Sequence, residues 1–208
     1  MSMDQASLIA ELKASLHDAA SVFTAANDAD IIRHLDMAAL DLGRFRPRIR
    51  SGSITLVPDQ PSYPAPSDMI APHRFRWGDA EQLQRRPWTS TYPGRMPRLS
   101  LIGDPGAAEI LLTPAPTQQQ IHLLGSSMTL LYRAGHTIAL QAADTTVRST
   151  DRGLLLLRAQ AEAMKELSSR NMKKPVSLRD GSNSTARNST PAALYEQLMR
   201  EFERQASC

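Results

Sequence analysis

Apolar residues recur at helical spacing at the start of the chain, and two helices are expected there. Leucines and alanines three and four positions apart predict the first helix over residues 4–25. Asn27 or Asp28 fits the cap of a second helix, whose apolar side continues to Gly43, a residue type that commonly ends helices. The pattern predicts a helical pair with a short connection.

A helical pattern returns in the last third of the chain. A helix from Asp151 includes four leucines at 154–157 and is apolar on much of its circumference, so it is expected to form the centre of the core. A shorter amphipathic helix is expected over Pro191–Gln205, with Thr190 as its N-cap. Its apolar stripe consists of Leu194, Tyr195, Leu198, Met199 and Phe202.

The middle of the chain follows another pattern. Proline is dense from Pro47 to Pro116, which excludes long helices, and short β-rich runs alternate with turn motifs. The expected strands cover 53–57, 98–102, 109–113, 119–124 and 128–133. Residues 60–97 are expected to form an irregular loop with a brief helix near 78–84.

These elements predict an α+β fold: a helical bundle core with an inserted antiparallel β-subdomain and an extended C-terminal arm that ends in a short helix. The expected divisions are an N-terminal helical pair at 1–50, a β-rich insertion at 51–140, a core helix at 141–172 and a tether with its docking helix at 173–208. The tether is polar and offers almost nothing for a core to bury.

The terminal helix needs a cover for its apolar stripe, because a helix of this length is marginal alone in water. Burying five such side chains contributes roughly 8–15 kcal/mol, while ordering the backbone costs about 1–2 kcal/mol per residue. Docking therefore decides whether the helix forms. It can fold back onto its own core, or the tether can deliver it to another molecule, and the sequence favours the second arrangement.

Charge is distributed unevenly along the chain. Residues 1–43 carry two basic and seven acidic groups, whereas residues 44–98 carry ten basic and four acidic groups. Such opposite charges suit internal pairing or contacts between subunits. The single cysteine, Cys208, excludes an intrachain disulfide and indicates a reducing, intracellular context. Neither a signal peptide nor a membrane span is expected.

An arginine run follows the second helix. Arg44, Arg46, Arg48 and Arg50 are spaced by two, and Pro47 favours extended chain, so the four guanidinium groups are expected on one face of a strand. Arginine binds phosphate well, and this face could meet DNA or an acidic partner. It could equally pair with the acidic N-terminal helices, which we slightly favour over direct DNA contact. No recognition helix is evident.

The sequence offers little support for catalysis. None of the five histidines has a metal-ligand spacing, and His17 and His34 are expected to face solvent or a neighbour. There is no phosphate-binding glycine loop and no nucleophile elbow. Asp28 and Asp30 fit helix capping better than a catalytic pair. We expect no enzyme activity, no metal and no cofactor.

Three segments carry a family likeness. The first is the helix end and arginine run at 36–50 with the strand at 53–57. The second is 63–70, where Ala65 stands at a position that is more often leucine. The third is 156–176, which continues into the terminal helix. On these segments the chain resembles bacteriophage head-to-tail adaptor proteins, also called connector or neck proteins, at both ends and only poorly in the β-rich middle.

The resemblance implies a virion structural protein of the neck, made in the host bacterial cytoplasm. Such adaptors form a ring of twelve copies beneath the portal protein, DNA passes through the ring without sequence reading, and tail or further neck proteins attach below. The C-terminal arm of the family embraces the portal or a neighbouring subunit. The implied arm contacts are the apolar stripe and the basic tether residues Lys173, Lys174, Arg179 and Arg187.

Two other classes of function stay open on the sequence. A basic nucleic-acid-binding protein would use the arginine run at 44–50 and bind duplex DNA with a steep salt dependence. A phage assembly factor or a small enzyme would depend on single histidine or aspartate side chains.

Overall fold

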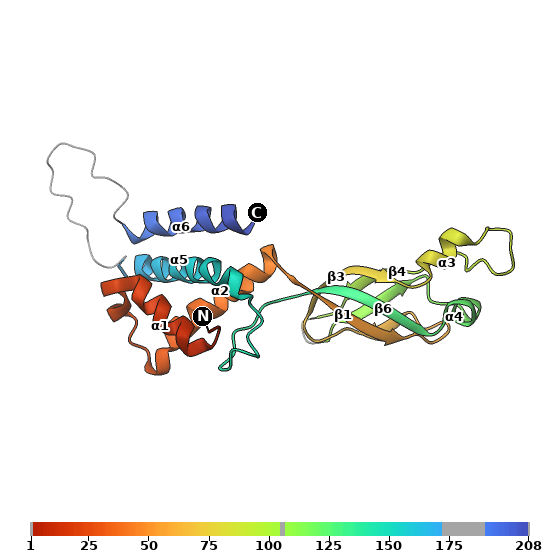
Figure 1. Cartoon of the computed structure of the whole chain (residues 1–208), viewed down its shortest axis with the longest axis horizontal. Coiled ribbons are helices and arrows are strands. Elements are labelled where there is room, and N and C mark those ends of the chain that lie inside the picture. Colours follow the sequence, from red (N-terminus) through yellow and green to blue (C-terminus); the bar gives the residue numbers. More distant parts are fainter. Residues whose placement is uncertain (1, 105–106, 172–189, 208) are drawn as a thin grey trace. The chain divides into compact units, whose positions relative to one another are not determined.

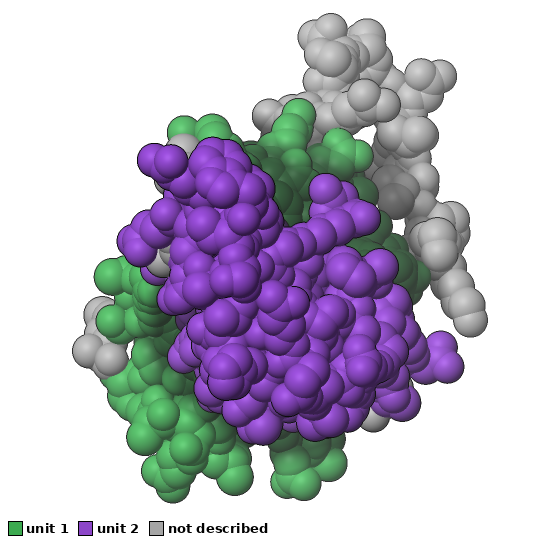
Figure 2. All heavy atoms as spheres, turned by 90° about the vertical axis from the view of Figure 1, so that its right-hand side faces the viewer, with its two compact units in different colours: residues 1–47, 136–208 green, residues 48–135 purple. Residues whose placement is uncertain are grey.

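The computed structural model describes residues 2–104, 107–171 and 190–207. The chain divides into two compact units, which Figure 2 colours separately. Unit 1 consists of Met1–Pro47 and His136–Cys208, and unit 2 consists of Arg48–Gly135. Unit 2 is therefore a continuous segment inserted into the sequence of unit 1.

Unit 1 is helical. Its α-helices are α1 (Gln5–Leu16), α2 (Ala29–Phe45), α5 (Arg152–Asn171) and α6 (Pro191–Ala206), and its 3₁₀ turns are η1 (His17–Val22), η2 (Ala26–Asp28) and η3 (Ser149–Asp151). Helix α5 packs against α6 on one side and against α1 and α2 on the other (Figure 1). The predicted central core helix is confirmed.

Buried apolar side chains explain the central position of α5. Leu155, Ala159 and Ala163 are inaccessible to solvent, and the two alanines let neighbouring helices approach closely. From α2, Ile31 and Leu35 enter the same core. Each such leucine or isoleucine contributes about 1.5–3 kcal/mol when it is buried, so α5 and α2 stabilise each other.

The first helix is shorter than its sequence predicts. Helix α1 ends at Leu16, because His17 has a φ of 48°, a left-handed conformation, and the chain continues as η1. Apolar residues keep their spacing beyond this point, since Phe23 is still buried in the core. The apolar pattern thus marks the core-facing side and does not report where the helix ends.

The second helix passes the glycine that was expected to end it. Helix α2 continues to Phe45, and Gly43 is buried within it. A glycine inside a helix costs about 1 kcal/mol relative to alanine. Leu42 is fully buried, however, and the ring of Phe45 packs edge-on against Phe202 with centroids 5.4 Å apart. These contacts outweigh the cost.

Unit 2 contains two antiparallel sheets of three strands each. Its strands are β1 (Arg48–Thr55), β2 (Ser62–Pro64), β3 (Met69–Arg76), β4 (Arg98–Ile102), β5 (Glu109–Thr113) and β6 (Ser127–Ala134), and its helices are α3 (Asp79–Gln84) and α4 (Gln118–Leu124). One sheet has the order β1-β6-β3 and the other β2-β5-β4. The α+β fold class is confirmed.

Side chains from both sheets form the core of unit 2. Strand β6 alternates strictly: Met128, Leu130, Tyr132 and Ala134 are buried. The second sheet contributes residues such as Ile110, which is fully buried in the same cluster. One face of the β1-β6-β3 sheet therefore covers the core, and its other face bears exposed side chains such as Thr129 and Arg133.

One predicted strand is a helix. Residues 119–124 belong to α4, which starts with a capping box: the Thr117 side chain accepts from the Gln120 backbone N–H, and the Gln120 side chain accepts from the Thr117 N–H. The buried Gln120 amide also donates to the carbonyls of Pro93 and Arg95. The expected alternation was wrong because this buried glutamine anchors a helix end.

The expected loop at 60–97 holds more structure than its sequence predicts. The brief helix near its middle is present as α3, but strands β2 and β3 also lie in this range. Both strands contain proline, which lowers their strand signal. Strands β4 and β5 occupy the predicted ranges.

Candidate interaction surfaces

The terminal helix α6 packs on the chain's own core. Thr190 caps it by accepting from the Ala193 N–H at 3.2 Å, and Pro191 occupies the first turn, as predicted. Phe202 is fully buried, while Leu194, Tyr195 and Leu198 are half-buried against the core of unit 1. The sequence favoured a cover from another molecule, whereas in the structure α5 of the same chain covers much of the stripe.

Arg46 holds the C-terminal end of α6. Its Nε donates to the carbonyl of Ala206 at 3.1 Å, one Nη donates to the carbonyl of Gln205 at 2.6 Å, and the other pairs with Asp151 at 2.8 Å. The last carbonyls of a helix lack partners and carry partial negative charge, so a cation there is favourable. Arg46 thus fixes α6 to unit 1 and is not part of a DNA-facing strand.

The stripe keeps a side that the core does not cover. Met199 is half-buried and does not belong to the residues packed on the core of unit 1. This side of α6 can therefore accept a further contact. The predicted basic residues of the tether lie outside the described residues: Lys173, Lys174, Arg179 and Arg187.

The arginine run at 44–50 does not form one face. Arg44 lies in α2 and pairs with Asp41 at 2.8 Å, because the helix continues to Phe45. Only Arg48 and Arg50 lie on a strand, β1, and they belong to unit 2. The expectation of four guanidinium groups on one extended strand was wrong.

Asp68 gathers the two strand arginines. Its carboxylate pairs with Arg50 and, at 3.8 Å, with Arg48, and it accepts from the Tyr132 hydroxyl at 3.0 Å. Burial is the largest influence on the Asp68 pKa and raises it, but the hydrogen bonds from Arg50 and Tyr132 outweigh burial and lower the pKa. Asp68 lies in the second segment of the family likeness, and its single negative charge is shared between these two arginines.

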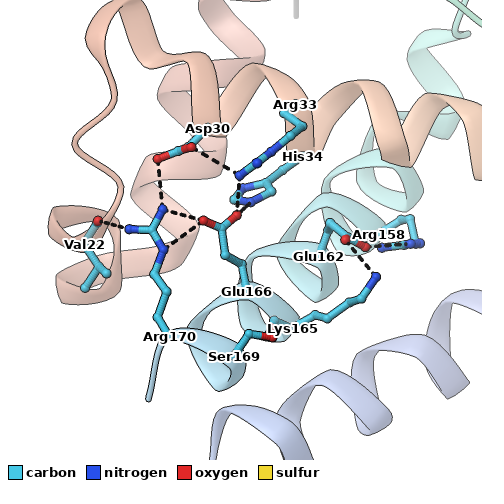
Figure 3. A network of polar contacts seen from close by, with 10 residues as sticks. All are labelled: Val22, Asp30, Arg33, His34, Arg158, Glu162, Lys165, Glu166, Ser169 and Arg170. Carbon is cyan, nitrogen blue, oxygen red and sulfur yellow. Dashed lines mark hydrogen bonds and ion pairs between the residues drawn. The ribbon is translucent and has the colours of Figure 1, made fainter. Parts of the chain in front are cut away.

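A polar network joins α2, α5 and η1 in unit 1, as Figure 3 shows. Glu166 is its centre: the carboxylate contacts His34 Nε2 at 2.8 Å and also pairs with Arg33 and Arg170. Asp30 pairs with Arg33 and Arg170, both at 3.2 Å. The network links helices that the sequence places more than 130 residues apart.

His34 is the main correction in this network. It was expected to face solvent or a neighbour, but its side chain is 1 % exposed and meets the Phe23 ring edge-on at 4.9 Å. His17 is exposed, as one of the two alternatives has it. Burial raises the Glu166 pKa most strongly, yet the hydrogen bonds from His34 and Arg170 more than offset it and lower that pKa. A helix pattern cannot distinguish a buried histidine of this kind from an exposed one.

Two further arginines of α5 are buried and pair with carboxylates. Arg158 pairs with Asp41 at 2.7 Å and with Glu162 at 2.9 Å, and Arg152 pairs with Glu11. These contacts tie α5 to α2 and α1. The acidic N-terminal segment therefore finds its counter-charges largely on α5, within the same unit.

The most exposed apolar side chains of unit 2 lie around α3. Leu83 is 88 % exposed, and Trp88, in the loop after α3, is 76 % exposed. The Arg86 guanidinium lies 5.5 Å from the centroid of the Trp88 ring. We call Leu83, Arg86 and Trp88 the α3 tip. Exposed large apolar residues beside a cation are typical of a protein contact.

The described residues hold no cluster suited to a metal ion. Within 2–104, 107–171 and 190–207, no group of three His, Cys, Asp or Glu side chains could hold a metal ion. None of the helices in these ranges has the length and apolar character that crossing a membrane requires.

The comparison with protein families gives one match. The family model described as SU10 adaptor protein matches residues 3–206, nearly the whole chain, including both units and α6. No curated protein matches the chain. The likeness that was carried by the two ends of the sequence therefore extends across the β-rich middle.

Proposed function

Because the chain belongs to the SU10 adaptor protein family, we propose that it is a structural protein of the virion neck that forms a ring under the portal, extends the DNA channel and provides the attachment site for the tail. The ring is expected to hold twelve copies, in line with the family resemblance. DNA would pass through its lumen without base reading. No catalytic step is needed for this role.

The observation that carries the proposal is the half-covered stripe of α6. Phe202 anchors the helix in unit 1, whereas Met199 offers apolar area that the core leaves free. An amphipathic helix with such a free side suits a groove on the portal or on a neighbouring subunit. The basic residues Lys173, Lys174 and Arg179, with Arg187, would favour an acidic surface beside that groove.

Joint binding by many copies makes a small contact sufficient. One such helix offers only a few side chains, so a single copy would bind weakly. In a ring, each copy that docks raises the effective concentration of the next, and the assembled ring binds much more tightly than one subunit. The proposal therefore predicts portal binding that depends strongly on ring formation.

The first test is Met199→Glu with Gln197→Glu as its matched control, since both add one negative charge to α6 and Gln197 is exposed. We expect Met199→Glu to weaken portal binding about tenfold or more, or ~1.4 kcal/mol per site, because a charge would be buried in the contact. The control should bind normally. Binding is measured with purified portal protein, and electron microscopy checks for stacked rings. If both variants bind the portal equally well, the Met199 side of α6 does not contact the portal.

A further inference from the structure

The free face of the β1-β6-β3 sheet carries positive charge without acidic partners. Strand β6 places Met128, Leu130, Tyr132 and Ala134 in the core, so Ser127, Thr129, Leu131 and Arg133 point to the opposite face. Residues paired directly across an antiparallel ladder share a face. The register therefore identifies which side chains of β1 and β3 join Arg133 there.

The neighbouring strands add two arginines and a row of hydroxyl groups. On β3, Arg74 pairs with Leu131 and Arg76 with Thr129. On β1, the partners of the same face are Ile49, Ser51, Ser53 and Thr55. We call Arg74, Arg76 and Arg133, with these serine and threonine side chains, the basic sheet face. Its members are exposed, and none is acidic.

The arginines of this face form no ion pair among the described residues, although Asp79 and Glu81 line a pocket together with Arg74 and Arg76. Arg48 and Arg50, on the edge strand β1, share the carboxylate of Asp68, but no ion pair involves Arg74, Arg76 or Arg133 within the part of the chain that the structure describes. Unit 2 as a whole has nine arginines against six acidic residues. The charge of the basic sheet face is thus available to a partner.

The chemistry of the face fits a phosphate backbone. Guanidinium and hydroxyl groups both donate hydrogen bonds to phosphate oxygens, and Arg74 and Arg76 are about 6.6 Å apart along the strand, so they can contact successive phosphates. Next to them, His73, Arg74 and Arg98 line a groove between β3 and β4. A protein partner would need apolar anchors, and the apolar residues that the register places on this face are Ile49, Ala71 and Leu131, with no aromatic side chain.

We propose that the basic sheet face binds the phosphate backbone of duplex DNA without reading its sequence. Short serine and threonine side chains on a sheet cannot reach far into a groove, so base contacts are not expected. The inference deepens the proposed function, on which its biological setting rests, by naming the surface that meets the DNA. It also moves the DNA contact away from residues 44–50, whose arginines pair with Asp41 or Asp68 or hold α6.

The experiment measures binding of the full-length chain to a short labelled DNA duplex at several salt concentrations. Three phosphate contacts give a slope of log K against log salt of about −2.7, or roughly 40-fold weaker binding at 200 mM than at 50 mM salt. The triple substitution Arg74→Ser, Arg76→Ser and Arg133→Ser should remove most of this slope. Lysine at the same three positions should retain it, because the charges remain.

The matched control is the triple substitution Arg44→Ser, Arg95→Ser and Arg148→Ser. These arginines are exposed and lie outside the basic sheet face, and their substitution removes the same net charge as the first triple substitution. The slope of log K against log salt for the control should stay within about one unit of the slope for the unmodified chain. All variants should keep the circular dichroism spectrum and the portal binding of the unmodified chain. Duplexes of different sequence should bind equally.

Three results would overturn the inference: no DNA binding by the unmodified chain, equal losses in the two serine variants, or a strong preference for one sequence. A chain that binds polyglutamate but not DNA would show that the face meets an acidic protein instead. Portal binding is measured separately, so failure of this inference is distinguishable from failure of the proposed function.

Discussion

At the residue scale, arginines that pair across elements decide how the helices of unit 1 meet. Arg46 closes the end of α6, Arg158 joins α5 to Asp41 of α2, and Arg170 reaches from α5 to the carbonyl of Val22. From the sequence alone, most of these arginine side chains would be predicted to lie in solvent. Their partners lie far away in sequence, so this part of the candidate site could not be predicted from spacing.

Glu166 shows why such a network depends on pH. Its carboxylate faces His34, Arg33 and Arg170, while Asp30 completes the set of charged groups around it. The net effect is a pKa below its ordinary value of 4.5. A carboxyl whose pKa is lowered by folding stabilises the folded state above its unfolded pKa, and this contribution disappears as pH falls through the folded pKa.

The corresponding prediction concerns Glu166→Gln. At pH 7 the variant should unfold more easily than the unmodified chain, because Arg170 and Arg33 lose a charged partner. As pH falls below about 4.5, the two free energies of unfolding should converge, since Glu166 is then protonated in the unfolded chain and loses its advantage in the folded one. Urea unfolding at a series of pH values measures the difference.

Glu203→Gln is the control for this series, because Glu203 is exposed on α6. Its free energy of unfolding should follow that of the unmodified chain at every pH, within about 0.5 kcal/mol. A difference for Glu166→Gln that is constant from pH 7 to pH 3 would mean that the carboxylate charge contributes nothing to this network.

At the element scale, the sequence predicts the bounds and the apolar side of a helix more reliably than the partner that covers that side. The bounds, cap and stripe of α6 agree with the prediction, because Thr190, Pro191 and the apolar spacing are local signals. The cover of the stripe is not local. Helix α5 covers much of this stripe. The apolar side of α5 is visible in the sequence, but the sequence does not show whether that side packs against α6 or against another molecule.

The docking of α6 leads to a prediction for Phe202→Ala. Phe202 is fully buried and contacts the ring of Phe45, so its truncation should cost about 3–5 kcal/mol. Met199→Ala, on the half-covered side of the same helix, should cost much less, about 1 kcal/mol. Thermal and urea unfolding of both variants give the comparison. Equal costs would contradict the packing of α6 on the core of unit 1.

The β-rich unit shows where local patterns succeed and fail. Strands β4 and β5 lie where their apolar runs predict them. Residues 119–124 were misassigned although Thr117 and Gln120 form a recognisable capping-box spacing, a signal that outweighs a short apolar alternation. Strands β2 and β3 were not predicted because they contain proline. Edge strands tolerate proline, but strand propensity alone does not distinguish an edge strand from a loop.

At the scale of the whole molecule, the two units differ in the surfaces they offer. Unit 1 has equal numbers of basic and acidic residues, fifteen of each, and many of them pair with each other. Unit 2 has a net charge of +3, an uncompensated sheet face and the apolar α3 tip. The sequence predicted a basic middle, but the strand register was needed to assign its charges to a face.

The tail-side contact is the prediction that belongs to the whole molecule. We expect the double substitution Leu83→Ala and Trp88→Ala to leave folding and portal binding unchanged, because both side chains are largely exposed. Tail attachment should fall strongly, since an exposed tryptophan beside an arginine is the kind of residue that carries binding energy. Electron microscopy of filled heads, incubated with each adaptor variant and then with tails, counts the joined particles.

Leu140→Ala is the matched control, because Leu140 is 78 % exposed but lies in unit 1. If tails join equally well on the double variant, or equally poorly on the control, the α3 tip is not the tail-side contact.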